Sequence, residues 1–153
     1  MQAAGGVGGA AVEKTATLIY NPYAGFDDWQ RQIDEVAAFW QGQGWQVALR
    51  TTQGPGHATQ LAAAAAAAGC QVVLSAGGDG TLHEIVQGLM GSRCILAPLP
   101  AGTTNCLARD LHLPKPESGD PHWLLHTAEA LLRGRVQAVD VGVCNNGKYW
   151  LLW

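Results

Sequence analysis

A glycine-rich stretch with a single carboxylate is the part of the sequence best suited to chemistry. It consists of Gly77, Gly78, Asp79, Gly80 and Thr81, directly after the apolar run 72–74. Glycine tolerates positive φ angles and lets an anion approach the backbone closely. A helix beginning at Thr81 would add unpaired N–H donors and a partial positive charge. The stretch therefore favours phosphate binding, provided that a metal ion or a reacting hydroxyl separates the phosphate from Asp79.

The spacing of these glycines differs from that of two common phosphate-binding loops. The sequence contains neither G-x-x-x-x-G-K-[ST] nor a G-x-G-x-x-G at this position. Taken alone, the stretch is equally compatible with a tight strand-to-helix turn that needs glycine only for its backbone angles.

The elements around this stretch alternate between strand and helix patterns. Strands are predicted at residues 17–20, 45–49, 71–75 and 94–97, and helices at 29–40, 58–68, 81–90, 106–111 and 122–132. This alternation predicts an α/β fold with a mostly parallel sheet flanked by helices.

Four loops rich in Gly, Asn or Thr would then meet at one edge of the sheet. They are residues 21–25, 52–57, 77–81 and 102–105. The carboxyl ends of parallel strands gather at the edge where open α/β sheets bind ligands. Their convergence favours a phosphate site over a bare turn.

Composition excludes several other classes. The 153 residues suffice for one domain with a core, only 14% are charged, the net charge is −3, and no basic stripe indicates nucleic-acid binding. No run approaches the ~20 apolar residues of a spanning helix. None of the cysteines forms a C-x-x-C pair, so their spacing indicates neither zinc nor a redox pair, and we expect free thiols in a reducing cytosol. They are Cys70, Cys94, Cys106 and Cys144.

Four short motifs follow one another between residues 21 and 109. They are Asn21-Pro22-x-Ala24-Gly25, Thr52 with Gly56-His57-Ala58, Gly77-Gly78-Asp79-Gly80-Thr81-Leu82-His83-Glu84, and Pro100-Ala101-Gly102-Thr103-x-Asn105 with Ala108-Arg109. The series resembles the catalytic domain of diacylglycerol, sphingosine and ceramide kinases, including bacterial lipid kinases. NAD kinases share the fold and the Gly-Gly-Asp-Gly loop, but the Gly-His-Ala and Gly-Thr-x-Asn elements favour the lipid kinases.

The resemblance implies ATP as phosphoryl donor, Mg²⁺, and a lipid hydroxyl as acceptor, on diacylglycerol or a related lipid. It implies phosphate contacts from Gly77, Gly78, Gly80 and Thr81, and further nucleotide contacts from Asn21, Thr52, Gly102, Thr103 and Asn105. Glu84 would act in the metal–water shell. Asp79 would be the catalytic base, as in sphingosine kinases, or a metal ligand. The second role is implied by bacterial diacylglycerol kinases, in which the base lies in the second domain.

Some positions depart from the family pattern. No Lys or Arg lies in the glycine loops, and Arg109 is the nearest cation. Thr104 replaces a glycine that the family usually has. His83 replaces the asparagine of many bacterial members, as it does in sphingosine kinases.

The resemblance also implies a second, β-rich domain. Residues 1–14 are expected to be a flexible tail, 15–134 the ATP-binding α/β domain, and 135–153 the first strands of a truncated β-rich domain. Strand-like alternation over 135–143, an Asn146-Gly147 hairpin signal and a return strand at 148–153 agree with this. The alternative is a complete small domain. The apolar residues 149–153 would leave an exposed strand edge that can pair with another copy of the chain, so we expect a homodimer.

These features predict the nucleotide-binding domain of an ATP-dependent lipid kinase of the diacylglycerol kinase type. We expect it in the cytoplasm, with only peripheral membrane contact. The alternatives are a sphingosine or long-chain-base kinase, an NAD kinase, and a nucleotide-binding fragment without turnover.

Overall fold

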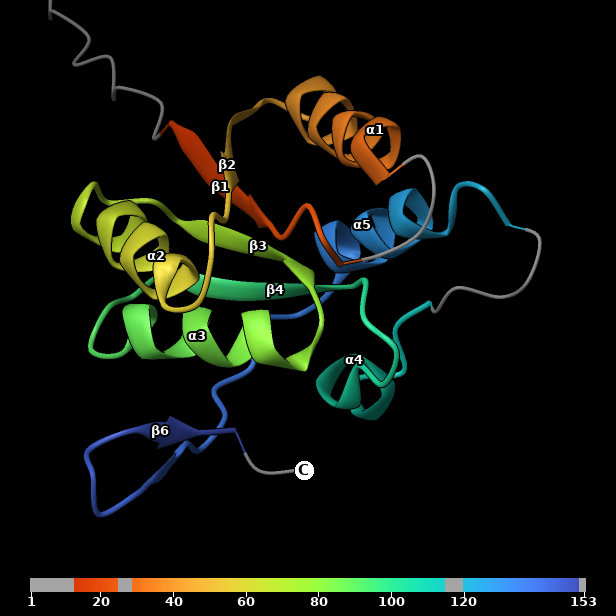
Figure 1. Cartoon of the computed structure of the whole chain (residues 1–153). Helices are drawn as coiled ribbons and strands as arrows, with labels where there is room; N and C mark the ends of the chain where they lie inside the picture. Colours follow the sequence, from red (N-terminus) through yellow and green to blue (C-terminus); the bar gives the residue numbers. More distant parts are fainter. Residues whose placement is uncertain (1–12, 25–28, 115–119, 152–153) are drawn as a thin grey trace, which may run out of the picture.

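The central sheet has four parallel strands in the order β2-β1-β3-β4 (Figure 1). The computed structural model describes residues 13–24, 29–114 and 120–151. The strands are β1 (Lys14–Tyr20), β2 (Trp45–Thr51), β3 (Val72–Gly77) and β4 (Ile95–Pro100). β1 already includes Lys14, the last residue of the predicted tail, and residues 1–12 lie outside the described ranges. The predicted parallel α/β sheet is confirmed.

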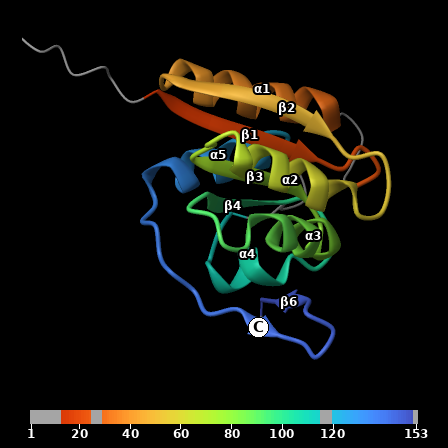
Figure 2. The same cartoon turned by 90° about the vertical axis from the view of Figure 1, so that its left-hand side faces the viewer.

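Helices cover both faces of the sheet (Figures 1 and 2). The helices are α1 (Trp29–Gly42), α2 (His57–Ala67), α3 (Asp79–Leu89), α4 (Cys106–Asp110) and α5 (Trp123–Arg133). Side chains alternate across a strand, so Val72 and Leu74 join the core beneath α1 and α5, whereas Val73 joins the core beneath α2 and α3. Among the described helices, none has the length and apolar character needed to traverse a bilayer.

α3 begins two residues earlier than predicted, at Asp79 rather than Thr81. Gly78 is its N-cap residue, and the Gly78 carbonyl accepts the Leu82 N–H at 3.1 Å. Asp79 and Gly80 therefore form the first helical turn, which places the carboxylate on the helix rather than in a loop.

The C-terminal segment is only partly regular. β5 (Gly142–Val143) and β6 (Tyr149–Trp150) form the predicted hairpin, but residues 135–141 have no regular structure. The prediction of a strand over 135–143 was therefore wrong for most of its length. Val136 and Val139 are exposed, so no neighbouring strand in the described residues stabilises an extended ladder there. Residues 152–153 of the predicted return strand lie outside the described ranges.

The hairpin is held against α3 by one side-chain amide. Gln87 donates from Nε2 to the Tyr149 carbonyl at 2.7 Å and accepts the Tyr149 N–H on Oε1 at 2.9 Å. One turn earlier on the helix, the His83 ring lies 4.7 Å from the Trp150 ring. Gln87 thus satisfies both backbone groups of one β6 residue, as a neighbouring strand would.

Candidate functional site

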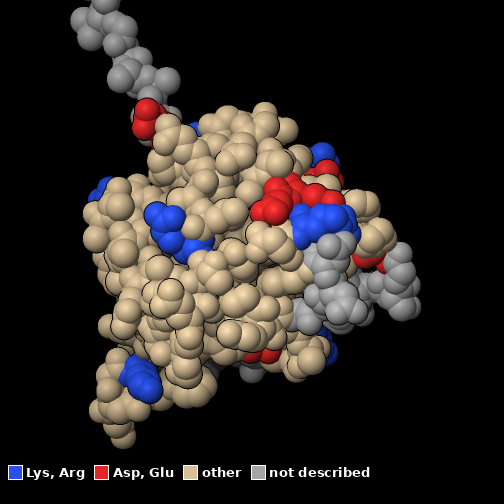
Figure 3. All heavy atoms as spheres, turned by 45° about the horizontal axis from the view of Figure 1, so that its top comes forward, with Lys and Arg blue, Asp and Glu red and all other residues tan. Residues whose placement is uncertain are grey.

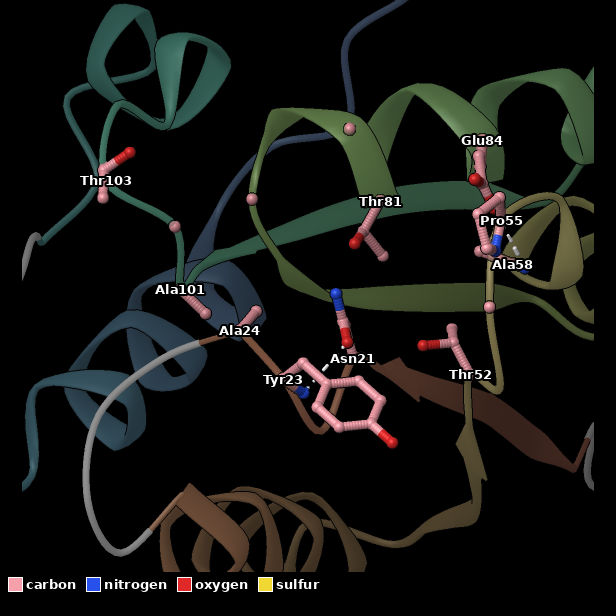
Figure 4. A pocket seen from close by; sticks show the side chains of 14 residues that line it. Asn21, Tyr23, Ala24, Thr52, Pro55, Ala58, Thr81, Glu84, Ala101 and Thr103 are labelled. Carbon is pink, nitrogen blue, oxygen red and sulfur yellow. Dashed lines mark hydrogen bonds between the residues drawn. The ribbon is translucent and has the colours of Figure 1, made fainter.

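A cavity of about 710 Å³ lies at the carboxyl edge of the sheet (Figure 4). Its walls come from the ends of β1 and β2, the start of α3, and the turn after β4. The chain builds β2 on one side of β1 and then crosses to β3 on the other, so strand order reverses between β1 and β3. Crevices at such reversal points are where open α/β sheets bind ligands.

Most of the predicted site residues line this cavity. They are Asn21, Thr52, Gly78, Gly80, Thr81, Glu84, Gly102 and Thr103. The convergence that the motif order implied is therefore real in three dimensions. The other predicted residues, Gly77, Asp79 and Asn105, instead line a separate hollow of about 10 Å³ behind the glycine turn.

Two glycines of the site are required by close packing. A Cβ on Gly102 would lie 2.5 Å from the Gly78 Cα, and a Cβ on Gly77 would lie 2.7 Å from the Thr81 side chain. The turn after β4 therefore rests directly on the start of α3.

Gly80 has a different setting. A Cβ built on it would meet no atom within 4 Å, and the residue is exposed in the first turn of α3. The packing of this protein does not demand glycine there. No side chain caps α3 at Gly78, so its N-terminus offers its N–H groups and dipole to an anion in the cavity.

The Asp79 carboxylate points at α4 rather than into the large cavity. Its Oδ1 accepts the Cys106 N–H at 2.8 Å, at the first residue of α4. Asn105 stabilises the same turn, because its side chain accepts the Gly102 N–H at 2.8 Å and donates to the Gly102 carbonyl at 2.6 Å. Asp79 and Asn105 therefore hold the turn over the glycine loop.

Glu84 borders the cavity, but its carboxylate also caps α2. Oε1 accepts the Gly56 N–H at 2.8 Å and Oε2 accepts the Ala58 N–H at 3.2 Å. The Thr59 hydroxyl donates to the Glu84 carbonyl at 2.8 Å, which makes a second link between the two helices. Glu84 thereby ties α3 to the start of α2 and to the end of the 52–57 loop.

The two predicted metal ligands diverge. Residues five apart on a helix are rotated by about 140°, and accordingly Asp79 bonds to α4 while Glu84 bonds to α2. Within the described ranges, no group of three His, Cys, Asp or Glu side chains could hold a metal ion. Mg²⁺ is usually bound by one or two carboxylates together with water and substrate phosphates. Glu84 fits that requirement in the cavity, whereas Asp79 in this position does not.

Asn21 and Thr52 extend the first two strands into the cavity. The Asn21 N–H donates to the Ala76 carbonyl at 3.1 Å, and the Thr52 N–H donates to the Tyr20 carbonyl at 2.9 Å. Figure 4 shows the Asn21 amide and the Thr52 hydroxyl facing the space beside Thr81. Their backbones are thus tied to the neighbouring strands, and both contribute polar groups to the cavity wall.

Several lining residues were not predicted. They are Tyr23, Ala24, Gly54, Pro55, Ala58 and Ala101. Tyr23 is 89% exposed, and Figure 4 shows its ring at the mouth. The available signal was an aromatic side chain within an otherwise Asn/Gly/Pro loop. Among the described residues that line the cavity, Glu84 is the one charged residue.

The comparisons with known proteins agree with each other. Residues 15–144 match the family described as "Diacylglycerol kinase catalytic domain". The diacylglycerol kinase of Bacillus subtilis (strain 168) is 32% identical over 140 residues, covering 90% of this chain and 44% of the relative. That of Staphylococcus saprophyticus is 31% identical over 137 residues, covering 88% and 43%.

Solved structures give the same result. A putative diacylglycerol kinase from Bacillus anthracis str. Sterne superposes with a TM-score of 0.76 at 27% identity, covering 90% of this chain and 48% of that one. The chain thus spans less than half the length of the relatives it matches.

Proposed function

Since the chain belongs to the diacylglycerol kinase catalytic domain family, we propose that it forms the ATP-binding part of a lipid kinase. The kinase would transfer the γ-phosphate of ATP to a hydroxyl of diacylglycerol or a related lipid. The observation that carries this proposal is the uncapped start of α3 beside a cavity of about 710 Å³, with Gly80 kept free of side-chain atoms.

The ATP phosphates would lie against Gly78, Gly80 and Thr81, where backbone N–H groups and the helix dipole stabilise negative charge. Asn21 and Thr52 would contact the nucleoside, and Gly102 and Thr103 would cover the opposite side. Phosphoryl transfer depends chiefly on positioning and charge stabilisation. Backbone N–H groups at the start of α3 would position the phosphates and supply part of the charge stabilisation.

Mg²⁺, when bound with the nucleotide, would neutralise phosphate charge. Glu84 is the residue of this chain placed to hold it, through the carboxylate lone pairs that the α2 N–H groups leave free. Asp79 would serve the site first by fixing the 102–105 turn through Cys106. A role for Asp79 as base or metal ligand would require its carboxylate to leave that hydrogen bond.

The remaining parts of the proposal concern the binding partners of the chain and its location in the cell. We also propose that the chain has no nucleic-acid partner; on the face shown in Figure 3, Lys and Arg form no continuous basic patch, and one group of them lies beside Asp and Glu. Contact with the lipid would be peripheral and on the cytoplasmic side. The exposed Val143 and Trp150 of the hairpin are an apolar edge through which the chain would form a homodimer.

The long-chain-base alternative draws no support from His83. Its ring packs on Trp150 and so has a structural partner. The acceptor is therefore proposed from the family alone, as diacylglycerol or a close relative.

A thermal-shift titration of this chain with ATP and Mg²⁺ tests the nucleotide site. The melting temperature should rise with ATP concentration, because a ligand that binds only the folded state stabilises it. Gly80→Asp places a carboxylate where the phosphate would lie, and a negative charge at a helix N-terminus does not destabilise the helix. We expect it to melt normally and lose the ATP response.

Gly80→Ala is the matched control, since its methyl group meets no atom of the protein. It should melt normally and, because it adds no charge, lose less of the ATP response than Gly80→Asp does. A wild-type protein that shows no shift at millimolar ATP, or a Gly80→Asp variant that responds as wild type does, would exclude this position of the phosphates.

A further inference from the structure

Two thiols far apart in the sequence lie together at the amino edge of the sheet, opposite the cavity. Cys70 precedes β3 and Cys94 precedes β4, and these strands are hydrogen-bonded neighbours with Val72 opposite Ile95. Both side chains are partly exposed free thiols that pack on the same apolar cluster beneath α2 and α3. The Ile95 N–H donates to the Gln71 carbonyl at 2.8 Å, so the residues that follow the two thiols are already paired.

The surroundings make the two thiols unequal. The hydrogen bond from Cys94 lowers the pKa of Cys70 to about 6, against the opposing effect of burial, and the Thr17 hydroxyl 3.3 Å from Sγ assists. The same bond and burial raise the pKa of Cys94. The Val72 carbonyl, 3.1 Å from Cys70 Sγ, accepts the proton while Cys70 remains a thiol. The Thr17 hydroxyl can also donate a hydrogen bond to a Cys70 thiolate, which favours Cys70 as the nucleophile of the pair and Cys94 as the thiol that resolves it.

We propose that Cys70 and Cys94 form an oxidation site that closes a reversible disulfide bond on exposure to a hydroperoxide. The Cys70 sulfur attacks one peroxide oxygen, the O–O bond breaks, and the leaving oxygen takes a proton to become water or an alcohol. The Cys94 sulfur then attacks the sulfenic sulfur of Cys70. The S–O bond breaks, and the departing hydroxyl leaves as water with the Cys94 proton. The thiols lose two electrons and the peroxide gains two.

The bond would join the starts of two strands that are already paired, so the fold need change little. It lies at the edge of the sheet away from Gly80 and Glu84. We therefore expect the oxidised chain to keep its ATP response. Its melting temperature should be higher than that of the reduced chain, because a cross-link restricts the unfolded state. This site is independent of the proposed kinase activity.

The test uses the whole chain and its two other cysteines as internal controls. The reduced protein is treated with hydrogen peroxide at pH 6, the remaining thiols are alkylated, and each cysteine is quantified by mass spectrometry. At pH 6 a thiol whose pKa is lowered keeps a larger thiolate fraction than an unperturbed thiol does. Cys70 should therefore be oxidised several-fold faster than Cys106 or Cys144, even though a low-pKa thiol is the weaker nucleophile.

The expected product is an intramolecular Cys70–Cys94 disulfide that dithiothreitol reduces. Cys94→Ser should stop at a sulfenic acid on Cys70, trapped by dimedone, and Cys70→Ser should abolish the fast reaction. If Cys70 and Cys94 oxidise no faster than Cys106 and Cys144, or if Cys70 links only to a second chain, the proposal is wrong. The wild-type measurement needs no variant, so it stands even if a serine variant folds poorly.

Discussion

The two faces of the sheet are packed differently, with tryptophans on one face and a close approach of two helices on the other. Under α1 and α5 the core contains large side chains, among them Trp29, Ile33 and Trp40. Under α2 and α3 the described core residues are aliphatic, and the three that α2 contributes are all alanines: Ala58, Ala62 and Ala65. A Cβ on Gly88 of α3 would lie 2.3 Å from the Thr59 carbonyl oxygen of α2, so these two helices approach each other closely.

This difference indicates that one face contributes mainly to stability and the other to the position of the site residues. Large buried side chains contribute most of the apolar area and hence most of the stability. Small residues allow two helix backbones to approach closely, and here that approach brings the Glu84 carboxylate to the N–H groups of Gly56 and Ala58. The packing of α2 against α3 therefore sets the position of residues that line the cavity. The face covered by α1 and α5 contributes mainly to the stability of the fold.

The largest effect is expected at Asp79, on the cavity side. If Asp79 leaves Cys106 during turnover and acts as the base, Asp79→Asn in the intact enzyme should lower lipid phosphorylation by a factor of about 10² to 10⁴, the range for loss of a proton-transfer group. Its Oδ1 can still accept the Cys106 N–H, so ATP affinity should change by less than about threefold. Asp79→Ala removes the cap as well and should weaken ATP binding. Turnover and affinity are measured separately, and a fully active Asp79→Asn enzyme would leave Asp79 only its capping role.

On the opposite face, Ile33→Ala should lower the free energy of unfolding by about 2–5 kcal/mol, because it opens a cavity at a fully buried position. The ATP affinity of the folded fraction should stay unchanged. Denaturant titration and calorimetric binding on the same sample check both values. A large loss of ATP affinity in this variant would show that the two faces are not separate in function.

Gly88→Ala should act on stability and binding together. Overpacking between α2 and α3 should cost about 1–3 kcal/mol, despite the better helix propensity of alanine. Because the helices must separate, Glu84 would lose its contacts with α2 and ATP affinity should fall. The matched control is Gly80→Ala on the same helix, which should leave stability unchanged or raise it by about 0.5 kcal/mol. Unchanged binding in Gly88→Ala would contradict the positional role.

A smaller effect is expected from Glu84→Ala, which leaves two N–H groups of α2 without their acceptor. Loss of a helix cap costs about 0.5–2 kcal/mol. ATP–Mg²⁺ affinity should also fall, whereas Glu84→Gln retains one acceptor oxygen and most of the stability. Equal stability of the alanine variant and the wild type in chemical denaturation would exclude the capping contribution.

The smallest effect concerns pH on the α1/α5 face. Burial raises the pKa of Glu35, but hydrogen bonds from His122 and Arg31 more than offset it and hold the pKa below its usual value of 4.5. A depressed carboxyl pKa contributes stability above the unfolded-state value, and this contribution is lost as the pH falls through the folded-state value. Unfolding curves between pH 6 and pH 3 should therefore differ between wild type and Glu35→Gln, with the shallower dependence in the variant.

The fold was largely predictable because each strand and helix carries its own periodic pattern, as Leu18, Val36 and Ile85 illustrate. Local pattern failed where a partner decided the outcome. The alternation around Val136 predicted a strand, but in the described residues no neighbouring strand pairs with it. The start of α3 at Asp79 depends on Gly78 acting as an N-cap, which periodicity does not encode.

The site was predictable in its location but not in its internal contacts. Motif order placed Asn21, Thr52 and Gly80 around one cavity. The bonds from Asp79 to Cys106 and from Glu84 to Gly56 join residues 27 and 28 positions apart. The Cys70–Cys94 contact likewise arises from strand adjacency. Such pairings are properties of tertiary structure, which the spacing of residues in one sequence does not reveal.

The all-parallel register has a consequence for how the chain reaches this state. Lys14 pairs with Trp45, and Ala16 pairs with Val72. No two strands of the main sheet can therefore pair until at least one intervening helix has been synthesised and has packed against the sheet. Folding rates fall as contacts become more distant in sequence, and strand edges stay uncovered during the delay. On the ribosome, β1 must wait for both of its neighbours, so nascent-chain chaperones should have their longest access to this first strand.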